Sequence, residues 1–440
     1  MIATVSIETY ERKFTIEMDL DYQKMCGKFN PETKVWEGVK IPYPASIDLH
    51  VSELVIDGLK KTPNRIVQMC YDDGFEMTCD ELRLKITRIA QNLKKLGIKD
   101  EDVVGIVCEN SMDLMAYTNG IYQLGAIVGA MSVIHCKDDM VMVFKYSKPK
   151  LMICDADVYD TVKQALKELK NSAPFYTTNG NVPGIESADE LLKSTGEEET
   201  YQTTKFKDPS NKVLALLPSS GTSDHLKGIS NTQTMFLKFI TLIPEEEMKT
   251  ISFSAIFWGP AFTALIVCPL TNEQRIVTRK PFQPEVFMDV TMKCKASHLI
   301  LNPTMLSLLM QSPFLPTFDT SCVKILTAIG GIFSEDLRAK IRKAFPTAYI
   351  MIFYGLTEIS CAFSYPGQPI DDLTVGYVAP NHLMKVVDDD GKSLGLEKSG
   401  EILVKFVISP FLVSLRNYLV KKWRVYPHFG QILGTVSTRK

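Results

Sequence analysis

A short loop of small and hydroxyl residues follows an apolar run near the middle of the chain. The run Val213–Leu217 ends at a proline, and the next residues read Ser-Ser-Gly-Thr-Ser-Asp-His-Leu-Lys-Gly over 219–228. Small side chains let backbone N–H groups approach an anion, hydroxyl groups add donors, and Lys227 adds a positive charge. Thr222 and Lys227 are therefore the predicted phosphate contacts. The Gly-x4-Gly-Lys-Ser/Thr spacing of a Walker A loop is missing, and an ordinary surface turn would have a similar composition.

One residue of this loop argues against phosphate binding. Asp224 carries a carboxylate, which repels a phosphate unless it faces away or meets a cation. The loop therefore predicts an anion site with one unfavourable charge in it.

Two further loops follow strand-like runs. Val323–Ala328 leads to Gly330-Gly331, and Ala348–Phe353 leads to Tyr354-Gly355-Leu356-Thr357-Glu358. Ligands of open α/β sheets bind outside the carboxyl ends of the strands. We therefore expect these two loops and the central loop to converge on one site.

The third loop supplies a carboxylate at its end. Glu358 could hold Mg²⁺ bound to nucleotide phosphates, and Thr357 could donate to a phosphate. An exposed glutamate at the start of a helix is the alternative, because the helix dipole favours it there. Tyr354 could stack on a base or could simply pack in the interior.

Aromatic side chains gather in one further stretch. Phe253, Phe257 and Trp258 could line an apolar acyl or aryl pocket, or could be plain core. Gly-x-Ser-x-Gly does not occur, so no nucleophile is indicated. The sequence favours chemistry that works by positioning and charge neutralisation on an activated phosphate.

Apolar strands and amphipathic helices alternate along the chain, which predicts an α/β fold with parallel strands. Thr78-Cys79-Asp80-Glu81 is a capping box that opens a helix ending before Gly97. We expect strands at Val103–Cys108 and Ser252–Phe257, and an irregular connector over 171–210. Further predictions are helices at 112–124, 158–169, 261–269 and from Ser334, strands at 126–133, 151–154 and 348–353, and a strand pair at 384–387 and 401–407.

Composition excludes several classes of protein. The chain has 440 residues, a net charge of −2 and 45% hydrophobic residues, typical of a globular protein that does not bind nucleic acid. Its ten cysteines include no C-x-x-C pair, which argues against a zinc site or a disulfide framework. No secretory signal, membrane-spanning run or Ser-Lys-Leu ending is present in the sequence.

The motifs together resemble those of the adenylate-forming (AMP-binding) superfamily, in the branch of acyl- and aryl-CoA ligases and insect luciferases. The central loop is similar to that family's Ser-Ser-Gly-Thr-Thr-Gly-x-Pro-Lys-Gly signature, and Tyr354–Glu358 matches its Tyr-Gly-x-Thr-Glu motif. Gly330-Gly331-Ile332 matches a Gly-Gly-Ala type loop between them. Gly376–Val378 and Gly400–Val404 resemble later landmarks, so the resemblance covers roughly residues 40–407.

The resemblance implies a reaction in which a carboxylate attacks the α-phosphate of ATP and a thiol, usually that of coenzyme A, then takes the acyl group. It implies ATP, Mg²⁺ and coenzyme A as reactants or cofactors, with Lys227, Thr357 and Glu358 catalytic. The phosphate loop would comprise Ser219, Ser220, Gly221, Thr222, Ser223 and Lys227. The adenine and AMP contacts would be Gly330, Gly331, Ile332, Tyr354, Gly355, Leu356 and Thr357. Phe253, Phe257, Trp258 and Gly331 would line the acid pocket, and Glu358 with Thr222 would serve the Mg²⁺.

The resemblance also predicts the domain organisation. Residues 1–45 would be a lead-in and 46–405 the large AMP-binding domain, with two layered sheets flanked by helices and a small distorted β subdomain. Its parts would be 46–210, 211–370 and 371–405. Residues 406–440 read as an atypical basic tail, since they contain no Asp or Glu. We find no match to the family's Gly-Trp-x-x-Thr-Gly-Asp segment or small C-terminal domain.

Other departures concern the motifs themselves. Asp224 stands where the family has Gly, Leu226 where it has Pro, and Trp258 where many relatives carry a His-containing motif. The leading expectation is an acid–CoA ligase acting on a fatty or aryl carboxylic acid, cytoplasmic or peroxisomal by resemblance. The alternative is a non-catalytic nucleotide- or acyl-binding pseudoenzyme or a truncated product.

Overall fold

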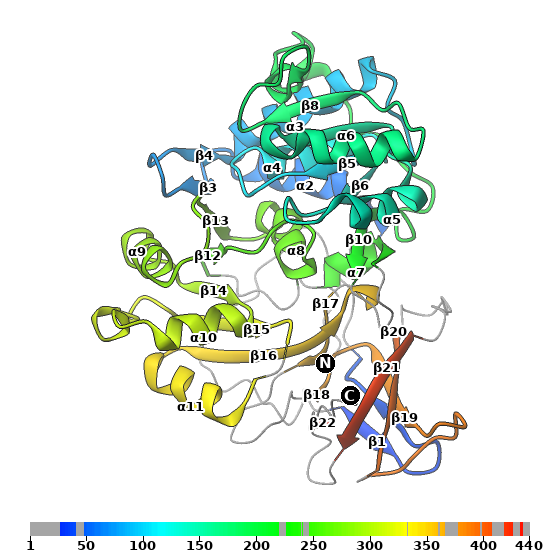
Figure 1. The fold of residues 1–440 in the computed structure, drawn as a ribbon, viewed down its shortest axis with the longest axis vertical. Coiled ribbons are helices and arrows are strands. Elements are labelled where there is room, and N and C mark those ends of the chain that lie inside the picture. Colours follow the sequence, from blue (N-terminus) through cyan, green and yellow to red (C-terminus); the bar gives the residue numbers. More distant parts are fainter. Residues whose placement is uncertain are drawn as a thin grey trace. The chain divides into compact units, whose positions relative to one another are not determined.

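The computed structural model describes residues 27–40, 48–219, 226–238, 240, 246–331, 333–359, 361–365, 377–396, 398–406, 418–425 and 432–433. The described residues divide into two compact units: those from 48 to 281 form the first, and those at 27–40 and from 282 onward form the second. Each unit is described by itself below. The predicted α/β fold is confirmed (Figure 1).

A seven-stranded sheet forms the centre of the first unit. Its strand order is β11-β10-β6-β5-β7-β8-β9, and all pairs are parallel except β10 with β11. The strands are β5 (Val103–Val107), β6 (Ile127–Ala130), β7 (Leu151–Asp155), β8 (Phe175–Thr178), β9 (Glu186–Ser187), β10 (Val213–Ser219) and β11 (Lys227–Thr232).

Alternating side chains of this sheet bury two separate cores, because successive strand residues point to opposite faces. Ile106 and Ile153 belong to one cluster, whereas Val107 and Met152 belong to the other. The first cluster includes residues of α2 (Val51–Lys61), α3 (Cys79–Lys95) and α4 (Leu114–Tyr122), and the second includes residues of α5 (Lys137–Ser147) and α6 (Tyr159–Glu168). Figure 1 shows α5 and α6 together on one face of the sheet.

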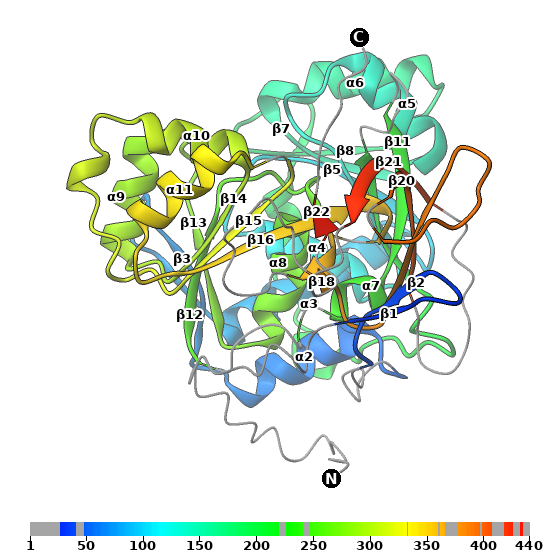
Figure 2. The same ribbon diagram turned by 90° about the horizontal axis from the view of Figure 1, so that it is seen from below.

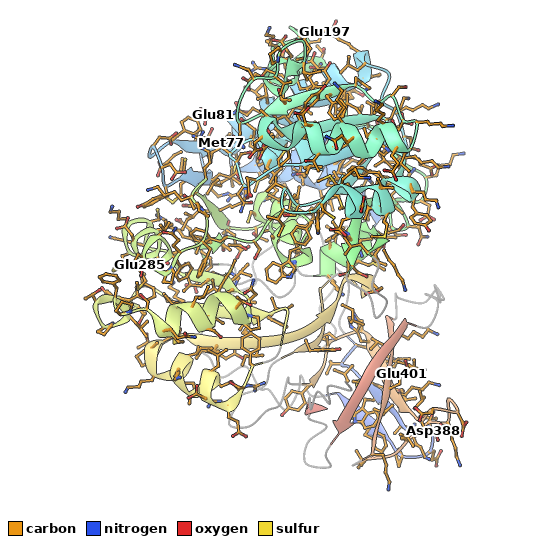
Figure 3. All side chains as sticks on the ribbon, viewed as in Figure 1. Met77, Glu81, Glu197, Glu285, Asp388 and Glu401 are labelled. Carbon is orange, nitrogen blue, oxygen red and sulfur yellow. The ribbon has the colours of Figure 1, made fainter. Side chains whose placement is uncertain are left out.

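The predicted capping box is present at the start of α3. The Thr78 hydroxyl accepts from the Glu81 N–H at 3.2 Å, and the Glu81 carboxylate accepts from the Thr78 N–H at 2.7 Å. Figure 3 labels Glu81 here, next to Met77 of strand β4. The backbone N–H groups of Thr78 and Glu81, which have no partner within the helix, are therefore both hydrogen-bonded, as the sequence predicted.

The first unit contains a second group of strands, in the order β12-β13-β3-β4. The strand expected at Ser252–Phe257 is wrong, because β12 lies earlier and ends at Ser252. Residues after Ser252 form a turn in which the Trp258 N–H donates to the Ala255 carbonyl. The elements are β3 (Ile66–Cys70), β4 (Glu76–Thr78), β12 (Met248–Ser252), β13 (Glu273–Val277), α7 (Gln233–Leu237) and α8 (Gly259–Val267).

The stretch 171–210 is more ordered than the expected connector. It contains β8 and β9, and it is held on α3 by charged and amide side chains. Arg88 pairs with Glu198 at 2.9 Å, and Asn92 donates to three carbonyls of the stretch. Its polar residues therefore make tertiary contacts that composition does not reveal.

One sheet region of the second unit has three parallel strands, β14, β15 and β16, and the antiparallel strands β17 and β18 follow them. Figure 2 shows α9, α10 and α11 grouped beside the parallel strands of this unit. The elements are β14 (His298–Leu301), β15 (Ile325–Ile329), β16 (Tyr349–Leu356), β17 (Cys361–Tyr365), β18 (Tyr377–Val378), α9 (Pro284–Cys294), α10 (Pro303–Gln311) and α11 (Glu335–Ala344).

A small antiparallel sheet completes the second unit, in the order β1-β2-β19-β20-β21-β22. The expected pair of late strands is confirmed, with Val387 opposite Glu401. Figure 3 labels Glu401 and Asp388, the residue after Val387. Residues of the predicted lead-in supply two strands, and Trp36 is buried against Met384. The strands are β1 (Lys28–Asn30), β2 (Val35–Glu37), β19 (His382–Val387), β20 (Ser399–Phe406), β21 (Tyr418–Val425) and β22 (Ile432–Leu433).

Among the described residues, no helix is long and apolar enough to span a membrane.

Candidate functional site

The central motif lies on an antiparallel hairpin of the first unit. Strand β10 is the predicted apolar strand, and it is held in the sheet by parallel pairing with β6. Ser219, its last residue, is paired with Lys227, the first residue of β11. Ser219 is buried and Lys227 is exposed. The predicted phosphate loop therefore begins and ends at neighbouring positions, with its lysine accessible to a ligand.

The tip of this hairpin lies outside the described residues. It contains the predicted contacts Ser220, Gly221, Thr222 and Ser223 and the unfavourable Asp224. Leu226, the first described residue after this tip, is half-buried and packs against the apolar cluster that includes residues of α5 and α6.

The predicted acid-pocket aromatics lie in the turn between β12 and α8. Phe253, Phe257 and Trp258 are all half-buried, whereas Ile256 between them is 1% exposed. Ile256 therefore supplies the core contact of this turn, and the three aromatic rings keep part of their surface accessible. Trp258 is the N-cap residue of α8, and its carbonyl accepts from the Phe262 N–H.

A histidine that the sequence interpretation passed over lies against this turn. The His135 ring meets the Phe257 ring edge-on, with 5.0 Å between centroids. Its Nδ1 accepts from the Ser132 N–H at 3.0 Å. Burial lowers the pKa of His135, which favours the neutral ring, although the Asp139 carboxylate opposes this. His135 follows β6, so it lies near the carboxyl end of a predicted strand, where ligands of α/β sheets bind. That position could have marked it as a candidate site residue.

The other two motifs lie at neighbouring strand ends in the second unit. Ile329 of β15 is paired with Phe353 of β16, so the residues that follow these two emerge side by side. Those residues are Gly330-Gly331 on one strand and Tyr354–Glu358 on the other. The structure thus brings together two of the three predicted loops, as the carboxyl-end rule requires.

The glycine pair has a conformational reason to be glycine. Gly330 has φ of +101°, a conformation that disfavours side chains. A Cβ on Gly331 would lie 2.9 Å from Cγ of Pro303, at the start of α10. Ile332 lies outside the described residues.

The Tyr-Gly-Leu-Thr-Glu motif is partly strand. Tyr354, Gly355 and Leu356 continue β16 and pair with β17, and Thr357 opens a short 3₁₀ turn containing Glu358. Tyr354 and Leu356 are half-buried and pack against the apolar cluster of the small sheet. Tyr354 can therefore pack in the interior and also stack on a base, because part of its side chain stays exposed.

Glu358 and Thr357 suit a magnesium nucleotide. Both are half-buried, and they provide a carboxylate and a hydroxyl oxygen. Mg²⁺ prefers oxygen ligands and usually takes only one or two carboxylates beside substrate phosphates and water. The described residues contain no cluster of three or more acidic, His or Cys side chains that could hold a metal by itself. The residues therefore fit a metal carried in with the nucleotide.

Comparison with known proteins supports this interpretation of the fold. A curated relative that the chain resembles is a probable 4-coumarate–CoA ligase of Dictyostelium discoideum, at 24% identity over 81% of this chain and 68% of the relative. Another is the luciferin 4-monooxygenase of Photuris pensylvanica, at 22% identity over 76% of this chain and 63% of the relative. The chain thus spans about two thirds of the length of these relatives.

A solved structure agrees with the fold as well. The luciferase-like enzyme of the nonluminescent Zophobas morio mealworm superposes with a TM-score of 0.81 at 21% identity, over 91% of this chain and 98% of that one. The family model described as AMP-binding enzyme matches residues 57–407. The chain therefore belongs to the AMP-binding, adenylate-forming enzyme family, as its three ordered motifs had indicated.

Proposed function

We propose that this chain activates a carboxylic acid with ATP and, as an acid–CoA ligase, passes the acyl group to coenzyme A. A carboxylate oxygen attacks the α-phosphorus of ATP, the bond from that phosphorus to the bridging oxygen breaks, and pyrophosphate leaves. The thiol sulfur of coenzyme A then attacks the acyl carbonyl, AMP leaves, and the thiol proton goes to solvent. The acid is of the fatty or aryl class.

The chain's own contribution to the first step is charge neutralisation. The carboxylate and ATP are both anions, so their approach needs fixed positive charges and hydrogen-bond donors. Lys227 and the hydroxyls of Ser219, Ser220, Thr222 and Ser223 take this role at the phosphates, with the backbone of Gly221. Thr357 donates to the α-phosphate, and Glu358 holds Mg²⁺, which would neutralise phosphate charge.

The nucleoside and the acid occupy different parts of the site in this proposal. Adenine lies along the backbone of Gly330-Gly331-Ile332 and against Tyr354-Gly355-Leu356. The acid lies against Phe253, Phe257 and Trp258, and meets Gly331 at the reacting end. One observation carries the proposal most directly: β15 and β16 end side by side, which puts the glycine pair next to the Tyr354–Glu358 motif.

ATP–pyrophosphate exchange tests the first half of the reaction. Purified protein is given labelled pyrophosphate, Mg²⁺-ATP and a panel of acids from hexanoate to palmitate, benzoate and 4-coumarate. We expect exchange that depends on one class of acid and falls at least tenfold in Glu358→Gln. Glu335→Gln, a change of an exposed carboxylate at the start of α11, is the matched control and leaves exchange unchanged. Absence of exchange with all acids would refute the proposal.

A second candidate function is binding of nucleotide or acyl ligand without catalysis. Asp224 favours it, because a carboxylate in the loop weakens the phosphate site. Calorimetry separates the two candidates. ATP binding without exchange for any acid indicates a pseudoenzyme, whereas exchange followed by thioester formation with coenzyme A indicates the ligase.

A further inference from the structure

Strand β13 carries a buried positive charge. Arg275 is 8% exposed and lies beside apolar Ile276 and Val277. Burial lowers the pKa of Arg275 to about 10, so the guanidinium stays charged at neutral pH. A buried charge is expensive unless its donors are matched, so its partners indicate what it does.

In the part of the chain that the structure describes, the groups that accept from this guanidinium are all neutral. It donates to Gln68 Oε1 at 2.9 Å, to the Ser111 carbonyl at 3.2 Å and to Asn110 Oδ1 at 3.0 Å. Gln68 in turn donates to the Met112 carbonyl at 2.9 Å. The charge therefore fixes the segment that follows β5.

Asn110 passes this constraint to another segment. Its oxygen accepts from Arg275, and its Nδ2 donates to the Ser254 carbonyl at 3.2 Å. The amide cannot flip without losing both bonds, because the guanidinium offers only donors and the carbonyl only accepts. The orientation of Asn110 is therefore set by the buried charge.

The carbonyl that Asn110 holds lies in the turn that carries the predicted acid-pocket aromatics. Ser254 is itself 8% exposed and follows Phe253 directly, and the turn closes at Trp258 through the bond to Ala255. Within the same segment, the Ser252 hydroxyl accepts from the Ser254 N–H at 3.3 Å. Asn110 thus anchors this turn from a segment far away in the sequence.

We propose that Arg275 and Asn110 are positioning residues for the acid pocket, which act by holding the backbone of Ser254 and with it the rings of Phe253, Phe257 and Trp258. The inference rests on the proposed function, because it takes those rings to contact the acid. Neither residue touches a reactant, so their loss alters binding of the acid and not of ATP.

Asn110→Asp separates the two bonds of the bridge. An aspartate keeps an oxygen for Arg275 but loses the N–H to Ser254, and it sets a carboxylate against that carbonyl. The buried guanidinium gains a counter-charge, so we expect the thermal unfolding temperature to stay level or rise. Asn171→Asp is the matched control, because Asn171 also accepts one N–H and donates to a carbonyl, that of Pro149, at 2.9 Å.

Fluorine NMR tests the positioning without any activity. The chain has three tryptophans, so 5-fluorotryptophan gives three resonances, and Trp258→Phe assigns the one of interest. We expect Asn110→Asp to shift the Trp258 resonance and leave the other two in place, and Asn171→Asp to leave all three in place. An unmoved Trp258 resonance in Asn110→Asp would overturn the inference. Asn110→Ser adds no charge, and its side chain is too short to bridge Arg275 and Ser254. This variant must also shift the Trp258 resonance.

Kinetics tests the link to the acid. In pyrophosphate exchange we expect Asn110→Asp to raise the KM for the acid by roughly fivefold, the effect of one hydrogen bond, with the KM for ATP unchanged. Equal rises in both constants would overturn the inference. If the wild-type protein shows no exchange, the proposed function is refuted. The fluorine NMR signal would still report whether Asn110 positions the turn, so the two failures can be told apart.

Discussion

Ser219 and Lys227 form the closing pair of the β10–β11 hairpin, one buried and the other exposed. The buried serine continues a strand that parallel pairing with β6 fixes in the sheet. Lys227 is therefore tied to a rigid element at its backbone while its ammonium group can reach outward. A lysine placed in this way suits contact with a phosphate at the loop between the two residues.

Lys227→Met is expected to lower ATP–pyrophosphate exchange by roughly 10- to 100-fold, because a charge-assisted hydrogen bond contributes about 1.5–3 kcal/mol. The substitution keeps most of the length of the side chain and removes the charge. The rate is measured at saturating acid over a range of ATP concentrations. Lys205→Met, at another exposed lysine, should leave the rate within twofold. A similar loss in both variants would mean that net charge, and not a phosphate contact, is responsible.

Asp224→Gly is expected to improve ATP binding. The aspartate lies in the same short loop as the predicted phosphate contacts, where a carboxylate repels the nucleotide. Two like charges about 10 Å apart repel by about 1 kcal/mol or more at an effective dielectric constant of about 20. Removing the carboxylate should therefore lower the Kd for ATP roughly fivefold. Calorimetry at low and high salt measures it. A Kd that rises instead would show that Asp224 helps to form the site.

Trp36 lies in the apolar cluster against which the Tyr354–Glu358 motif of the second unit packs. Its ring is 1% exposed in the small sheet's cluster, against which Tyr354 also packs. Trp36→Ala should cost about 3–5 kcal/mol in the free energy of unfolding, because it leaves a cavity. Trp36→Phe should cost less. The Trp36 Nε1–H is buried without an acceptor among the described residues, and the variant removes it. Urea unfolding of both variants tests this order, and equal costs would contradict it.

Local signals predicted a large part of this structure. The Thr78–Glu81 capping box and the apolar run of β10 are encoded over a few residues, and both are present. The strand expected at Ser252–Phe257 was wrong because Phe-Ser-Ala-Ile-Phe has a strand's composition, whereas the pairing of β12 with β13 reaches only Ile251 and β12 ends at Ser252. Trp36 could not be placed from sequence, because its partner strand β19 lies hundreds of residues later.

The same distinction applies to the candidate site. Gly330-Gly331 and Tyr354–Glu358 could be predicted because strand-end motifs are short and ordered along the chain. The Arg275–Asn110 hydrogen bond could not be predicted, because it joins a residue of β13 to one in the segment after β5, more than 160 residues earlier in the chain. Strand β13 reads Glu-Gln-Arg-Ile-Val, so its sequence alone does not mark Arg275 as a buried charge that needs polar partners.

Protonation of His50 is expected to weaken the protein in mild acid. The ring is 1% exposed at the start of α2, where its Nδ1 accepts from the Ser52 N–H. Burial, helped by the positive charge of Lys212, lowers the pKa of His50 from 6.5 to about 4. The unfolded chain therefore binds the proton more tightly than the folded one. The contribution of neutral His50 to the free energy of unfolding is fully present above pH 6.5. It is lost as the pH falls toward 4, and the loss reaches about 3 kcal/mol.

His50→Asn tests this origin of the acid sensitivity, because asparagine also caps a helix but does not titrate in this range. The free energy of unfolding is measured with urea at pH 7.5, 5.5 and 4.5. The wild-type protein should lose more stability over this interval than the variant. His135, whose pKa burial also lowers, adds a loss of the same sign to both proteins and cancels in the comparison. Equal losses would assign the acid sensitivity to groups other than His50.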